Sequence, residues 1–262
     1  NMAEAIIGGI LDCNVFSKAE ICAMDIDEAR IKYIREKYGI NAVLNSQEEL
    51  KKSEIVILSV KPQSLAGLMD GMKAGLNPES LFLSILAGVK IGTLEKYINF
   101  EEKKSKIVRV MPNLGAFVRK SVSAIAFKES IKKNDRDISR KIFESIGYVH
   151  FCDESLINSV TAVSGSGPAY LFQFMDSFVE SAKSVGIKEN EAFDYCIETF
   201  EGALNLLMQR KDSPKDLVKK VASKGGTTEA ALNVFNNRGF ESLIKEAVTA
   251  AFNRAKELGE KC

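Results

Sequence analysis

The hydrophobic pattern of the chain changes near Glu154, and this change constrains the fold more than any other feature. Before Glu154, short apolar runs typical of buried strands alternate with helical segments, whereas helical periodicity alone continues to the C-terminus. Strands that alternate with helices are typical of a parallel, doubly wound sheet. We therefore predict an α/β domain over residues 1–152 and an all-α domain over residues 153–262.

Apolar runs in the first domain predict its strands and the place of a ligand. The runs lie at residues 19–25, 55–60, 81–86, 106–110, 123–127 and 148–151. Ligands of doubly wound sheets bind beyond the carboxyl ends of the strands, where this chain has small and turn-forming residues. These are Ser59 to Pro62, Ala87 to Val89 and Met111 to Asn113. The pattern is that of a Rossmann-type domain with a dinucleotide in one crevice.

The first residues, 1–11, have the apolar face of a helix but no turn that leads into it. Two interpretations stay open at this point. Either a short strand and a loop precede the numbered chain, or the chain begins with a frayed helix, and composition does not distinguish the two.

Asp25 stands at the end of the first apolar run. Dinucleotide folds place a carboxylate there to bind the adenosine ribose hydroxyls, and a 2'-phosphate would meet like charge. On that interpretation Asp25 favours NADH over NADPH. The alternative is that Asp25 is a helix N-cap before Ile26, and the sequence leaves both interpretations open.

The second domain is predicted to hold long amphipathic helices. An apolar stripe from Leu171 to Val185 ends at Gly186, and further helices are expected at residues 192–208 and 240–258. Their apolar faces are wider than one small domain needs. We therefore expect some of these side chains to be buried between subunits of a homodimer or a larger homo-oligomer.

Two glycines and two threonines in the stretch from Ser223 to Glu229 run directly into a helical pattern. Glycine lets the backbone approach a ligand closely, and the first N–H groups of a helix have no intrahelical partner. The stretch is therefore suited to hold a carboxylate. The alternative, which the spacing alone favours, is an ordinary helix start with Thr227 as the N-cap.

Composition and missing motifs exclude several classes of function. The formal net charge is +1, so neither nucleic acid nor a membrane surface is an expected partner. The expected partners are small molecules or copies of the chain. The five cysteines lack metal-ligand spacing, so we predict no metal site and a cytoplasmic protein. The single histidine, His150, falls in a predicted strand, and no nucleophile elbow or phosphate-binding loop occurs.

The shortage of general acids favours an imine as substrate. Reducing a carbonyl requires a proton donor for the developing alkoxide, whereas a protonated imine already carries the charge that attracts hydride. Such a reaction needs its substrate carboxylate held, its ring oriented and a hydroxyl near the ring nitrogen.

Several motifs together resemble the pyrroline-5-carboxylate reductase family over the whole chain. The segment from Ser164 to Tyr170 is similar to the family's S-G-S-G-P-A-Y, Gly225 to Thr228 to its G-G-T-T, and Val60 to Pro62 to its V-K-P. Ser84 to Val89 and Met111 to Asn113 agree with two more family segments. The resemblance implies reduction of 1-pyrroline-5-carboxylate to L-proline with NAD(P)H, and a helical domain that interleaves two chains.

The resemblance also implies the residues of the site. Those expected to contact the cofactor are Asn1, Met2, Asp25, Asn45, Ser59, Val60, Lys61, Pro62, Ala87 and Gly88. Those expected to contact the substrate are Glu154, Gly225, Gly226, Thr227 and Thr228, with the Thr228 hydroxyl near the imine nitrogen as the catalytic group. The resemblance further implies that the Gly225 to Thr228 stretch of one subunit closes over the crevice of its partner.

Departures from the family pattern leave other functions open. Leu114 to Ala116 stand where the family usually has T-P-A, and Lys224 stands where it usually has proline. The alternatives are a reductase of another cyclic imine or of a β-hydroxyacid, for which Lys183 is a poorly placed proton donor, and a catalytically idle relative that binds dinucleotide.

Overall fold

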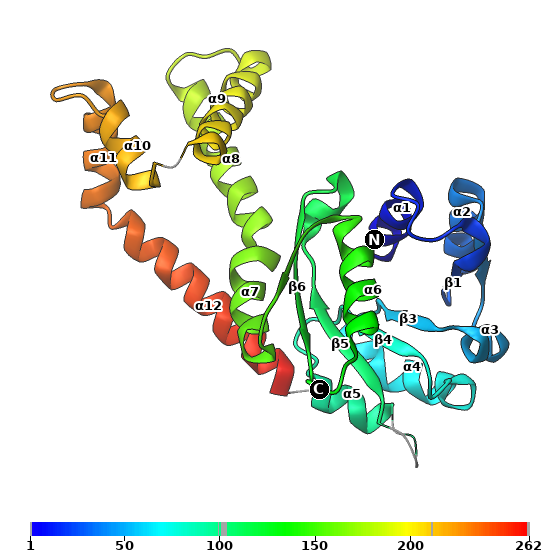
Figure 1. The fold of residues 1–262 in the computed structure, drawn as a ribbon. Helices are drawn as coiled ribbons and strands as arrows, with labels where there is room; N and C mark the ends of the chain where they lie inside the picture. The colour runs from blue at the N-terminus through cyan, green and yellow to red at the C-terminus, as the bar shows by residue number, and fades with distance from the viewer. Residues whose placement is uncertain (1, 99, 101–103, 211, 261–262) are drawn as a thin grey trace. The chain divides into compact units, whose positions relative to one another are not determined.

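The computed structural model describes residues 2–98, 100, 104–210 and 212–260, and Figure 1 labels its helices and strands. The chain divides into two compact units. The first comprises Asn1–Ser166 with Ala251–Cys262, and the second comprises Gly167–Ala250. The bounds of these units differ from those of the predicted domains. The predicted domain boundary between residues 152 and 153 stays a prediction.

The strands of the first unit form two sheets. β1 (Cys22–Met24) pairs in parallel with β2 (Asn41–Val43), and the other strands form one sheet in the order β3-β4-β5-β6-β7. Their bounds are β3 Ile55–Leu58, β4 Leu81–Ser84, β5 Lys106–Met111, β6 Ser121–Phe127 and β7 Gly147–Phe151. The predicted strands are confirmed. β2 was not predicted, because three residues are too few to show a strand period.

The direction of β6 corrects the prediction of a parallel sheet. β3, β4 and β5 are parallel, but β6 runs antiparallel to β5, with Met111 opposite Ala124. Only residues 112–120 connect these two strands, and a parallel crossover needs a dozen or more. α6 (Lys133–Glu144) then supplies the crossover that brings β7 parallel to β6.

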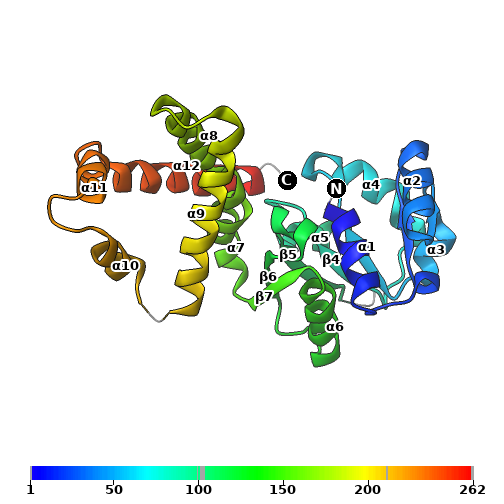
Figure 2. The ribbon, with the colours of Figure 1, turned by 90° about the horizontal axis from the view of Figure 1, so that it is seen from above.

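Helices cover both faces of the larger sheet, as can be followed in Figure 2. Besides α6, the helices of the first unit are α1 Met2–Asp12, α2 Glu28–Tyr38, α3 Gln47–Lys52, α4 Leu65–Met72, α5 Ile91–Tyr97 and α7 Ile157–Val160. Leu83 of β4 is buried with Phe143 of α6, whereas Phe82 is buried on the other face with Met69 of α4. β4 is consequently buried along its whole length, as expected for a strand covered on both faces.

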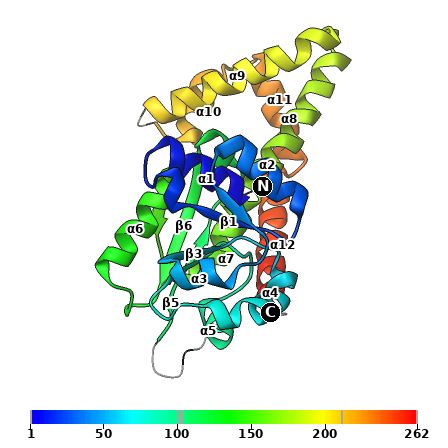
Figure 3. The same cartoon turned by 90° about the vertical axis from the view of Figure 1, so that its right-hand side faces the viewer.

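The C-terminal part of α12 (Phe240–Glu260) belongs to the first unit, and Figure 3 shows its red end near α4. Leu258 and Gly259 lie against Gly88, which follows β4 and has a φ of 80°. A Cβ on Gly88 would stand 3.0 Å from the nitrogen of Gly259. Both the left-handed φ and this close approach require glycine at the position.

The second unit consists of helices in its described residues. Besides the first part of α12, these are α8 Gly167–Ser184, α9 Glu189–Gln209, α10 Pro214–Val221 and α11 Thr227–Asn237. Aromatic rings hold part of it together, since the centroids of Phe178 and Phe200 lie 4.9 Å apart. Among the described residues of this unit only Ala192 and Cys196 are buried. Large apolar side chains are exposed instead, including Leu171, Phe172, Phe193, Leu204, Met208, Val221, Val234 and Leu243.

None of the helices in the described ranges is long and apolar enough to cross a lipid bilayer. Cys13, Cys22, Cys152 and Cys196 are free thiols. The cytoplasmic location stays a prediction.

Candidate active site

Parallel pairing brings several predicted cofactor-binding residues to one edge of the larger sheet. β4 pairs in register with β3 on one side and with β5 on the other, so the carboxyl ends of these strands lie together. Ser59, Val60 and Lys61 follow β3, and Pro62 begins a short helix that leads into α4. Ala87 and Gly88 follow β4. Contact of these residues with a cofactor stays a prediction.

The pairing of β1 with β2 places Asp25 and Asn45 near one another. Met24 pairs with Val43, and the Asp25 N–H donates to the Val43 carbonyl at 3.3 Å. Asp25 therefore follows the end of β1, while Asn45 lies two residues beyond β2, and both side chains are exposed. This is the edge at which a dinucleotide fold binds adenosine.

The N-cap of α2 is Asp27, so the alternative interpretation of Asp25 as the helix cap is wrong. The Asp27 carboxylate accepts from the N–H groups of Ala29 and Arg30 at 2.9 and 3.3 Å. Asp25 instead accepts from the Asp27 N–H at 3.1 Å, which fixes the turn between β1 and α2. Asp27 is the cap because it directly precedes the first helical residue, and its carboxylate therefore reaches the unpaired amides of the first turn.

The start of α1 carries the densest polar cluster of the first unit. Glu4 accepts from Arg30 at 2.5 Å through Oε2, and from Lys37, Tyr33 and Tyr38 at 2.8, 2.9 and 3.2 Å through Oε1. Sequence analysis missed this cluster, because only the packing of α1 against α2 brings its members together. Met2 is the first described residue of α1, and Asn1 lies outside the described residues.

The charge of Glu4 is strongly favoured in this cluster. Burial alone would raise the pKa of Glu4, but the hydrogen bonds from Lys37, Arg30 and Tyr33 outweigh it and lower the pKa to about 2. The same bonds raise the pKa of Lys37 and of Arg30. Glu4, Arg30 and Lys37 are therefore all ionised at neutral pH.

Glu154 joins the segment after β7 to the sheet. Its Oε1 accepts from the N–H of Ile91, the first residue of α5, at 2.7 Å and from Arg109 at 3.3 Å. The side chain of Arg109 is only 2% exposed, and its Nε and Nη2 have no hydrogen-bond partner among the described residues. Burial lowers the pKa of Arg109, and the charge of Glu154 opposes this. The signal that sequence analysis passed over was an arginine inside the apolar run of β5.

Two stretches that the sequence analysis singled out meet in the first unit. The side-chain amide of Asn113 donates to the carbonyl and the hydroxyl of Ser164 at 3.1 and 3.0 Å. A Cβ on Gly165 would stand 2.9 Å from the terminal methyl of Met111, so the two segments touch. Residues 111–113 thereby fix the turn that precedes α8.

The glycine-threonine stretch forms a tight turn before α11 in the second unit. Gly225 has a φ of 76°, and Gly226 is the N-cap, which corrects the alternative interpretation of Thr227 as the cap. The Gly226 N–H donates to the Ser223 carbonyl at 3.0 Å, and the Gly225 N–H donates to the Glu229 carboxylate at 2.8 Å. The turn therefore already binds one carboxylate, that of its own helix.

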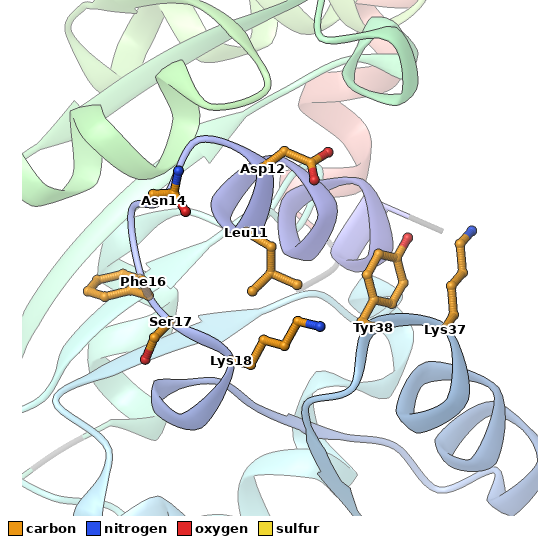
Figure 4. Close-up of a pocket in the computed structure, with 8 residues that line it drawn as sticks. All are labelled: Leu11, Asp12, Asn14, Phe16, Ser17, Lys18, Lys37 and Tyr38. Carbon is orange, nitrogen blue, oxygen red and sulfur yellow. The ribbon is translucent and has the colours of Figure 1, made fainter.

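A shallow pocket of about 310 Å³ lies between α1 and α2 (Figure 4). None of the predicted site residues lines it. It shares Lys37 and Tyr38 with the Glu4 cluster, and Figure 4 shows the polar ends of both side chains pointing toward α1. This pocket is therefore separate from the predicted crevice at the strand ends.

Comparisons with known proteins agree on one family. The family described as pyrroline-5-carboxylate reductase dimerisation matches residues 154–258, and the family described as NADP oxidoreductase, coenzyme F420-dependent, matches residues 1–88. A pyrroline-5-carboxylate reductase of Synechocystis sp. is 34% identical to the chain over 260 residues, which is 99% of this chain and 96% of the relative.

Solved structures show the same likeness. A pyrroline-5-carboxylate reductase from Coxiella burnetii is 30% identical, with a TM-score of 0.87 and coverage of 98% of this chain and 94% of that one. A Plasmodium falciparum pyrroline carboxylate reductase, solved with NADP bound, is 26% identical, with the same TM-score and coverage. The predicted fold class, a Rossmann-type domain followed by a helical dimerisation domain, is confirmed.

Replacing Glu154 by alanine is expected to destabilise the protein by roughly 3 kcal/mol, because the buried Arg109 loses the one carboxylate that the structure gives it. Denaturant unfolding measures the loss. The matched control is Glu144→Ala, which removes an exposed pair with Arg140 and should cost less than about 1 kcal/mol. The double variant Arg109→Met with Glu154→Ala should recover much of the loss. If Glu154→Ala and Glu144→Ala lower the free energy of unfolding equally, the buried pair stabilises the protein no more than an exposed pair does.

Proposed function

The chain belongs to the pyrroline-5-carboxylate reductase family, and we propose how its own residues carry out the reaction of that family. It is an NAD(P)H-dependent oxidoreductase that reduces 1-pyrroline-5-carboxylate to L-proline. The observation that carries this conclusion is the match to curated reductases over 99% of the chain. The nicotinamide cofactor supplies a hydride for the imine carbon, and the protonated imine nitrogen takes the electron pair of the double bond.

The residues at the strand ends suit a dinucleotide. Asp25 and Asn45 are exposed at the ends of paired parallel strands, where they can hydrogen-bond an adenosine ribose. The first N–H groups of α1 suit the pyrophosphate, with Met2 over it. We assign the stretch from Ser59 to Pro62, with Ala87 and Gly88, to the nicotinamide half. Asn1, predicted beside Met2, lies outside the described residues.

The substrate carboxylate is assigned to the turn from Gly225 to Thr228. The bond between the Gly225 N–H and Glu229 supports this, because it demonstrates that the turn accommodates a carboxylate oxygen. Glu229 has to leave that N–H for a substrate to use it, and the amides of Thr227 and Thr228 add further donors at the helix start. We assign the hydroxyl of Thr228 to the imine nitrogen.

Glu154 is proposed to face the substrate from the sheet. Both donors that the structure gives it, Ile91 N–H and Arg109, bind Oε1. Among the described residues no donor binds Oε2, so this oxygen can accept from a protonated ring nitrogen. The bonds from Ile91 and Arg109 fix the direction of the carboxylate.

The cofactor preference is proposed to be NADH. The exposed carboxylate of Asp25 suits a ribose with two free hydroxyls and repels a 2'-phosphate. The next residue, Ile26, is 90% exposed and supplies no positive charge in compensation.

Thr228→Ala is expected to lower kcat/KM for the imine roughly 10- to 100-fold, because a hydrogen bond to a charged nitrogen is lost in the transition state. Steady-state consumption of NADH measures this, and the dissociation constant of the cofactor should stay close to that of the wild type. Thr228→Ser should retain most activity, and Thr199→Ala, in α9, is the control. An equal loss of cofactor affinity would contradict the proposed role of Thr228.

Asp25→Ser is expected to lower the ratio of the KM for NADPH to the KM for NADH by about tenfold, because a like charge beside the 2'-phosphate is removed. The control is Glu28→Gln, which removes the next acid in the first turn of α2. If Asp25→Ser leaves the ratio of the two KM values unchanged, Asp25 only fixes the turn between β1 and α2 and has no role in cofactor preference.

The chain is a homo-oligomer through its helical part, and a dimer as the smallest assembly is our proposal. The exposed apolar side chains of α8, α9 and α11 supply the surface that a second copy would cover. Light scattering at micromolar concentration should give at least twice the mass of one chain. A monomer under those conditions would contradict the proposal.

A further inference from the structure

The Glu4 cluster and Asp25 form one connected system at the adenosine end of the proposed cofactor site. The Asp25 carboxylate is bound by the Asp27 N–H, and the Asp27 carboxylate is bound by the Arg30 N–H. The backbone of Arg30 is therefore two hydrogen bonds away from Asp25. Its guanidinium is bound to Glu4, 2.5 Å from Oε2, and the charge of Asp25 also acts on it, since both Glu4 and Asp25 raise the pKa of Arg30.

Arg30 is a cation of this system on which the charge of Asp25 acts. A dinucleotide fold that binds a 2'-phosphate uses an arginine near this position, whereas one that binds a free ribose uses an acid. This chain has both residues. The arginine, however, is paired with a second acid from α1, and its side chain is 29% exposed while that of Glu4 is only 12% exposed.

Glu4 also neutralises a second cation, because Lys37 binds the other carboxylate oxygen at 2.8 Å. Two tyrosine hydroxyls complete the shell of Glu4, at 2.9 Å for Tyr33 and 3.2 Å for Tyr38. A carboxylate with this many donors holds its charge and does not release its cations readily.

We propose that Glu4 is a specificity residue for the cofactor: its ion pair with Arg30 competes with a 2'-phosphate for that guanidinium and so contributes, with Asp25, to a preference for NADH. The proposal rests on the proposed function, since it takes the adenosine ribose to lie beside Asp25. Asp25 acts by repulsion, and Glu4 acts by occupying the Arg30 guanidinium, which could otherwise offset that repulsion.

A purely structural role is the competing explanation. On that explanation Glu4 only ties α1 to α2, and losing it loosens the site for both cofactors alike. The two explanations differ in the ratio of two affinities. A specificity role changes the dissociation constant for NADPH much more than that for NADH, whereas a structural role raises both together.

The experiment measures dissociation constants by fluorescence titration of NADH and of NADPH into the full-length chain without substrate. Glu4→Gln should tighten NADPH about tenfold relative to NADH, because Arg30 gains a charged partner in the 2'-phosphate. Adding Arg30→Met to Glu4→Gln should abolish that gain. The matched control is Glu36→Gln, which removes one acid from the exposed side of α2, where its contact is with Lys32 at 3.9 Å. It should change neither affinity.

The specificity role and the structural role of Glu4 predict different results. Equal weakening of both cofactors in Glu4→Gln, with a lower melting temperature, would overturn the proposal in favour of the structural role. If Glu4→Gln fails to fold, the single variant Arg30→Met decides between the two explanations. If Glu4 occupies Arg30 in the wild type, Arg30→Met leaves the affinity for NADPH unchanged. A several-fold loss of that affinity overturns the proposal. A wild-type chain that binds neither cofactor would refute the proposed function itself, which is a different result.

Discussion

The parallel pairing of β3, β4 and β5 is the constraint on which the rest of the first unit depends. Parallel strands are joined by crossovers, and the crossover helices α4 and α5 cover one face of the sheet, while α1 and α6 cover the other, so β4 is buried completely. The same pairing sets the carboxyl ends of β3, β4 and β5 at one edge. Ser59, Ala87 and Gly88 are far apart in the chain, yet they become neighbours there because backbone hydrogen bonds fix the register of their strands.

Charged side chains in the first unit serve to fix segments that the sheet does not hold. Glu154 lies beyond the last strand, and its bonds to Arg109 and to the N-terminus of α5 attach the chain to the sheet before it enters the helical part. Glu4 does the same for α1 and α2. In both places a carboxylate with several donors offsets the cost of removing charge from water, and each carboxylate lies next to a stretch assigned to ligand binding.

The helical unit obeys a different constraint. It buries few side chains within one chain and exposes many large apolar ones, so another copy is needed to complete its core. The turn before α11 binds a carboxylate within one chain, because the Gly225 N–H donates to Glu229. Under the proposed assignment of the substrate carboxylate to this turn, the substrate and Glu229 compete for that donor.

The sequence by itself determined the fold class, every strand except β2, the principal helices and the family, because hydrophobic period and short glycine-containing motifs are local properties of the chain. It did not determine the direction of β6, which followed from the short link between residues 112 and 120. Nor did it determine which acid caps α2, or that Glu4 would meet Arg30 and Glu154 would meet Arg109. Those pairs are separated by 26 and 45 positions, and only tertiary packing sets the distances on which charge interactions depend.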